Sequence, residues 1–109
     1  MENKIKNFIK RELNITPELM GYDYIVQAIW YIIEAGGAAK VSIVDMYKTI
    51  AEENDTNSSA VERSIRHALK RVSDSPDLLK NVGNLFSCDL RNGFTNGRFL
   101  ALCAEYLMD

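Results

Sequence analysis

The apolar segment at residues 22–35 is the feature that most limits what this chain can fold into. Apolar side chains occupy most of its positions, and the largest are Ile25, Ile29, Trp30, Ile32 and Ile33. Its β-branched residues would also allow a strand, but strands rarely exceed about ten residues and this segment is longer. We therefore expect a central helix that is buried on most sides and that ends at Gly36 and Gly37.

The remainder of the 109 residues reads as amphipathic helices separated by short polar breaks. Apolar residues recur at helical spacing over residues 3–14, 42–53, 58–72, 76–86 and 96–107. Ser75 is a suitable N-cap with Pro76 at the first helical position, and Thr95 is a suitable cap for the last helix. No repeat or linker divides the chain, so we expect one compact all-α domain of six helices over residues 1–109, without a sheet.

The composition excludes several kinds of site. His67 is the only histidine, and Cys88 and Cys103 are the only cysteines, so the chain lacks the four ligands of a structural zinc site. We expect no metal, no cofactor and two free thiols, with Cys103 buried on an apolar stripe. No nucleophile, base and orienting group converge in the sequence, so we do not expect an enzyme. The chain has no signal peptide and no membrane-length apolar run, which predicts a cytoplasmic protein.

Two other groups of side chains have a structural and a functional interpretation. We expect the aromatic residues of the central segment to lie in the core or at its rim rather than to form a stacking platform for bases; they are Tyr22, Tyr24, Trp30 and Tyr31. Arg91 and Arg98, in and beside the loop at residues 89–97, could contact phosphates, but we prefer a plain loop.

Positive charge is concentrated in one short stretch of an acidic chain. The formal net charge is −2, yet residues 56–72 carry four cations against the single carboxylate of Glu62. This local charge of +3 leaves −5 for the rest of the chain. The charge distribution therefore indicates a localised electrostatic feature.

The short helix predicted at residues 46–53, a polar turn and the longer helix at 58–72 have the order of a helix-turn-helix. On a helical wheel of the longer helix, the apolar residues fall within about 100° of its circumference; they are Val61, Ile65, Ala68, Leu69 and Val72. The opposite side carries Ser59, Arg63, Arg66, His67 and Lys70. One side should therefore be buried while the other presents cations.

Such a cationic face suits duplex DNA. Cations neutralise phosphates and release counterions, and arginine pairs with guanine while carboxylates accept from cytosine. Ser59, Glu62, Arg63 and Arg66 lie in the first two turns, which enter the major groove most deeply in this motif. The alternative is an ordinary solvated helix in which Glu62 and Arg66 form a surface ion pair.

The segment Thr56 to Ala68, TNSSAVERSIRHA, closely resembles the recognition helix of the stage zero sporulation protein A family, the response regulators of endospore formation. Further matches follow in the same order; they are Gly21-Tyr22-x-Tyr24-Ile25, Met46-Tyr47-x-x-Ile50-Ala51, Leu85-Phe86 and Thr95-Asn96-x-x-Phe99-Leu100-Ala101. The resemblance covers residues 5–107 or nearly so.

The resemblance implies a six-helix effector domain of the winged-helix-like DNA-binding superfamily, with its helix-turn-helix at about 46–72. It implies that Glu62 and Arg63 read base edges, and that Ser59, Arg66 and His67 hold phosphates or border the bases. Lys70 would contact phosphate from the same face. His67 also has an ordinary interpretation, as a side chain at the rim of the helix.

The chain departs from the family in two respects. Ala60 stands where the family often carries arginine, which puts the usual target sequence in doubt. There is no receiver domain, so the chain is either an excised effector domain or a natural single-domain relative. Two functions follow: a transcription regulator that binds DNA as side-by-side copies, or an interaction module for an RNA polymerase sigma subunit or a full-length regulator.

Overall fold

Helix α2 (Gly21–Ala35) runs through the middle of the protein, and helices from both ends of the chain pack against it. The computed structural model describes residues 1–109. The buried side chains of α2 include Ile25, Ala28, Ile29 and Ile32, which are 0% exposed. The predicted central helix is therefore confirmed. No helix of the protein combines the length and the apolar character that a membrane span requires.

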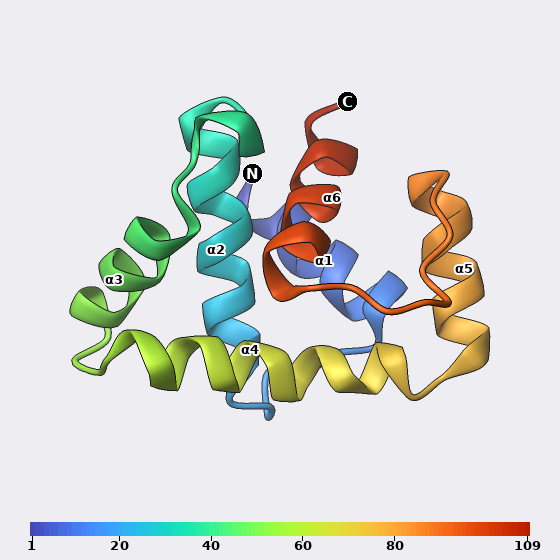
Figure 1. The fold of residues 1–109 in the computed structure, drawn as a ribbon, viewed down its shortest axis with the longest axis horizontal. Helices are drawn as coiled ribbons and strands as arrows, with labels where there is room; N and C mark the ends of the chain where they lie inside the picture. Colours follow the sequence, from blue (N-terminus) through green and yellow to red (C-terminus); the bar gives the residue numbers. More distant parts are fainter.

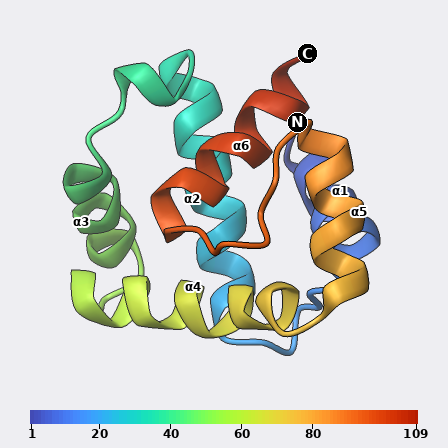
Figure 2. The ribbon, with the colours of Figure 1, turned by 45° about the vertical axis from the view of Figure 1, so that its right-hand side comes forward.

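Five further α-helices surround α2, and there is no strand. They are α1 (Glu2–Leu13), α3 (Ile43–Glu53), α4 (Ser58–Ser73), α5 (Pro76–Phe86) and α6 (Asn96–Met108). In Figure 1, α4 lies across one side of the molecule, with α3 near its first end and α5 near its last, while α2 and α6 stand above it. Both termini lie away from α4 (Figure 1 and Figure 2). The expected all-α domain of six helices is confirmed.

Polar residues at the polar breaks define where four of these helices begin. Each side-chain oxygen accepts a hydrogen bond from a backbone N–H three residues further on, which satisfies a donor that the first turn leaves free. The caps are Ser42 for α3, Asn57 for α4, Ser75 for α5 and Thr95 for α6. Ser75 and Thr95 therefore have the roles expected from the sequence, with Pro76 in the first turn of α5.

Two local features differ from the sequence-based expectation. After α2 ends at Gly36, with φ 92°, the chain forms a 3-10 turn, η1 (Ala38–Lys40), which is too short to produce a periodic pattern. Trp30 is 37% exposed and so lies further from the core than Tyr22, which is 6% exposed. Trp30 therefore lies at the rim of the core, beside a groove that residues of α2, η1 and α3 line.

The apolar side of α4 is completely buried. Val61, Ile65, Ala68, Leu69 and Val72 are each at most 1% exposed, and together they face α2 and α3. These are the five residues that the helical wheel places on the core side. The rotation of α4 about its own axis is therefore confirmed.

Gly21, the first residue of α2, allows α2 and α4 to touch through their backbones. A β-carbon at Gly21 would overlap the Ser64 carbonyl oxygen and would lie 2.9 Å from the β-carbon of Ala68. The backbone of an adjacent helix cannot move aside as a flexible side chain can. Glycine is therefore required here by the close approach of the two helices.

We expect Ile65→Ala to lower the free energy of unfolding by about 2–5 kcal/mol, because it removes buried apolar atoms and leaves a cavity. Ser64→Ala is the control, since the Ser64 side chain is only partly buried and lies off the apolar stripe. Thermal or urea melts of the two variants would measure the difference. Equal stabilities would mean that α4 is rotated differently from the structure.

We expect Gly21→Ala to destabilise the domain by about 1–3 kcal/mol, because the added methyl group forces α2 away from α4. Gly97→Ala in the first turn of α6 is a matched control. Its β-carbon would be 3.4 Å from the Ile43 side chain, an ordinary contact. Urea unfolding would detect the contrast, and equal midpoints for the two variants would contradict the close helix contact.

Candidate nucleic-acid interface

Side-chain hydrogen bonds hold the turn between α3 and α4 at its two ends, through Asn54 and Asn57. Asp55 adopts the left-handed conformation with φ 53°, and Asn57 then caps α4. The Asn54 side chain donates to Gln27 Oε1 of α2 at 2.8 Å and to the Ile50 carbonyl oxygen at 2.7 Å. The turn is therefore attached to the central helix, and the first turn of α4 begins at a fixed point.

The side of α4 opposite the core faces solvent along the whole helix, on one side of the molecule (Figure 1). Five of the six residues that the sequence analysis singled out are exposed there; they are Ser59, Arg63, Arg66, His67 and Lys70. Glu62, the sixth, is half-buried at the edge of this face. We call these six residues the α4 face. Whether they contact DNA stays a prediction.

The charged residues of the α4 face differ in the partners they already have. Arg66 forms an ion pair with Glu62 one turn earlier, and Lys70 Nζ lies 2.7 Å from Asp74 Oδ2. Arg63 and His67 make no side-chain hydrogen bond or ion pair. Exposed pairs of this kind stabilise a helix by only about 0.3–0.5 kcal/mol. Arg66 and Lys70 could therefore exchange their partners for a phosphate at little cost.

A shallow groove of about 420 Å³ runs beside this face, between α4 and the segment that leads into α6. It brings together four of the predicted residues, Arg63, Arg66, His67 and Lys70, with Phe94 and Asn96 on its other side. The ring of Phe94 packs 4.5 Å from that of Phe99, centroid to centroid, which holds this wall of the groove against the core. Ser59 and Glu62 lie outside the groove.

Asn96 is a residue of this region that the sequence analysis did not assign a role. Its Nδ2 donates to the Glu62 carbonyl oxygen at 3.1 Å. It also lies near the Tyr47 hydroxyl of α3: burial raises the pKa of Tyr47, and the nearby Asn96 amide acts in the opposite direction. The only signal in the sequence was the Thr95-Asn96 pair at the start of α6, which does not reveal a partner 34 residues away.

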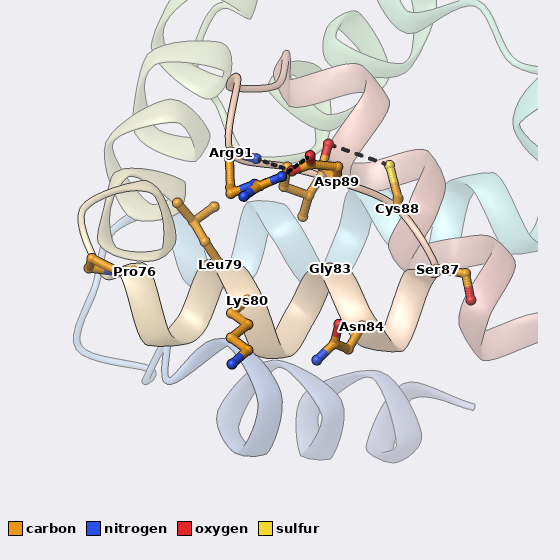
Figure 3. Close-up of a pocket in the computed structure, with 10 residues that line it drawn as sticks. Pro76, Leu79, Lys80, Gly83, Asn84, Ser87, Cys88, Asp89 and Arg91 are labelled. Atoms are coloured by element: carbon orange, nitrogen blue, oxygen red, sulfur yellow. Dashed lines mark hydrogen bonds and ion pairs between the residues drawn. The ribbon is translucent and has the colours of Figure 1, made fainter.

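Arg91 and Arg98 both have local partners. The Arg91 guanidinium donates to Asp89 at 2.8 and 3.0 Å, as Figure 3 shows, and this pairing lowers the pKa of Asp89 to about 2. Arg98 Nη2 donates to the Cys88 sulfur at 2.9 Å. These contacts are exposed, like those of Arg66 and Lys70, so the plain-loop interpretation stays a prediction.

A second surface depression lies between α5 and residues 87–91 and has a volume of about 980 Å³ (Figure 3). Its lining residues include Leu79, Lys80 and Asn84 from α5, with Cys88 and Asp89 from the loop that follows. No group of three His, Cys, Asp or Glu side chains in the protein is placed to hold a metal ion. Cys88 and Cys103 are both free thiols, and Cys103 is buried as expected.

Comparison with protein families identifies the chain. The family described as "Sporulation initiation factor Spo0A C terminal" matches residues 5–107, which is nearly the whole chain. The comparison of this chain with solved structures found no match. This family is a DNA-binding regulatory one and not a family of enzymes. Its match confirms the resemblance that the α4 segment carries, and the chain therefore belongs to the family of C-terminal, DNA-binding effector domains of the sporulation regulator Spo0A.

Proposed function

We propose that this domain is a sequence-specific transcription regulator that reads duplex DNA by placing α4 in the major groove. The observation that carries the proposal is the division of α4 into a fully buried apolar side and an exposed side with Arg63, Arg66, His67 and Lys70. A major groove about 12 Å wide admits one helix. Residues 56–72 carry +3 in a protein of net charge −2, so α4 is the side that attracts phosphates.

In this proposal the first two turns of α4 read the bases. Arg63 is exposed and unpaired, so its guanidinium is available for a guanine, and the Glu62 carboxylate can accept from a cytosine. Ser59, Arg66, His67 and Lys70 flank them and contact phosphates or border the bases. Ala60 offers no side chain that reaches a base, so the preferred sequence differs from one read through an arginine at that position.

A second proposal is that the domain binds protein rather than a specific DNA sequence. The net charge of −5 outside residues 56–72 and the alanine at position 60 favour it. The partner would be an RNA polymerase sigma subunit or a full-length regulator. A selection from random duplexes at stated salt separates the proposals, because only the DNA reader enriches a common sequence.

We expect binding of one domain to duplex DNA to be weak and to fall steeply with salt. Two or three phosphate contacts give a slope of about −2 to −3 in a plot of log affinity against log salt. Lys70→Ala should reduce that slope by about 1. Lys40→Ala is the charge-matched control, because Lys40 belongs to η1, which follows the end of α2 that lies away from α4 (Figure 1). A flat salt dependence would contradict the electrostatic role of α4.

We expect Arg63→Ala to weaken binding to the selected sequence by about 1–3 kcal/mol and to relax base preference at one position, because the guanidinium fork is lost. His67→Ala and Lys70→Ala should weaken all duplexes about equally. Binding measured on the selected duplex and on single-base variants of it would test this. Base preference that is unchanged in Arg63→Ala would remove Arg63 as a base reader.

A further inference from the structure

Asn96 occupies a position where its side chain is free for a tertiary contact. It is the first residue of α6, and the cap of that helix is already supplied by the Thr95 hydroxyl, which accepts from the Arg98 N–H at 3.1 Å. The Asn96 side chain is half-buried and turns toward α4 instead. Its hydrogen bond to Glu62 is the only one made by a side chain between α6 and α4. Helix capping therefore does not explain it.

The atom that Asn96 holds belongs to the backbone of the first two turns of α4. The Glu62 carbonyl belongs to the peptide that joins Glu62 to Arg63, the two residues assigned to base edges. Inside a helix this oxygen accepts one bond from the N–H four residues later and has a second lone pair free. The 3.1 Å bond from Asn96 uses that second lone pair.

The hydrogen bond from Asn96 restrains the direction of the Glu62 carbonyl, which the apolar contacts of α4 do not. Burial of Val61 and Ile65 decides which side of α4 faces the core, but the hydrophobic effect is non-directional and does not align a single peptide group. A hydrogen bond requires its donor and acceptor to stay near 3 Å and aligned. The Tyr47 hydroxyl of α3 lies near the same amide. Asn96 also lines the groove beside Arg63 and Arg66.

We propose that Asn96 is a positioning residue for base reading: its amide fixes the Glu62–Arg63 peptide and so aims the two side chains that carry sequence preference. This inference rests on the proposed function. Asn96 itself needs no contact with a base. Its loss would remove the directional restraint on the Glu62–Arg63 peptide. Base contacts require alignment and would be affected much more than contacts with phosphates, where Lys70 acts as a flexible point charge.

The decisive quantity is the specificity ratio, the affinity for the selected duplex divided by that for a scrambled duplex of equal length and composition. A residue with only a structural role changes the folded fraction, which scales both affinities by the same factor and cancels in the ratio. A positioning residue changes the ratio itself. The measurement therefore separates the two roles even where a variant is less stable.

The experiment uses the 109-residue chain and three variants at one stated salt concentration. Asn96→Ala removes the amide without adding charge, and Asn96→Asp keeps the shape of the side chain but removes the donor. Asn92→Asp, exposed in the preceding loop and without a side-chain hydrogen bond, adds the same charge as the second variant and is its matched control. We expect the ratio to fall about three- to tenfold in both Asn96 variants and to stay within twofold of wild type in Asn92→Asp.

The outcomes distinguish this inference from the function on which it rests. A wild-type domain that shows no preference overturns the proposed function, and the role of Asn96 with it. A wild-type preference that Asn96→Ala retains within twofold overturns the role of Asn96 alone. If the specificity ratio falls in both Asn96→Asp and Asn92→Asp but is unchanged in Asn96→Ala, the fall is an effect of charge. That result also overturns the role of Asn96.

Discussion

Burial of one side of α4 against α2 is the contact on which the rest of the structure depends. Val61, Ile65 and Ala68 leave no exposed apolar surface on that side, and Gly21 lets the two backbones touch. The same contact decides which residues of α4 face outward. The orientation of α4 about its own axis therefore determines both the core and the candidate interface. A change that turned α4 would lower stability and would also move the cations away from the exposed side.

Features with a local cause could be predicted from the sequence. The five apolar positions of α4 recur with the period of a helix, so the core side follows from spacing alone. Ser75 and Thr95 act as caps because their hydroxyls reach only the first turn of the helix they begin. The exposed positions of Arg63 and His67 follow from the same wheel, although their contacts with DNA stay predictions.

Features with a non-local cause could not be predicted. Two hydrogen-bonded pairs are far apart in the sequence: 27 residues separate Gln27 from Asn54, and 34 separate Glu62 from Asn96. No periodic pattern along the chain predicts either pair. The half-exposed ring of Trp30 depends on how closely neighbouring helices cover one side of α2. Such contacts are set by the tertiary arrangement, whereas the pattern of apolar residues reports only which side of an element is covered.

The charge distribution gives the alignment of α4 its importance in the proposed function. With −5 outside residues 56–72, most of the surface outside α4 repels phosphates. The electrostatic contribution that is common to all sequences then comes from α4 alone, through about two or three phosphate contacts. A larger share of the binding free energy must come from base edges, where recognition depends on direction. A protein with this charge distribution has more to gain from a fixed Glu62–Arg63 peptide than a strongly basic one would.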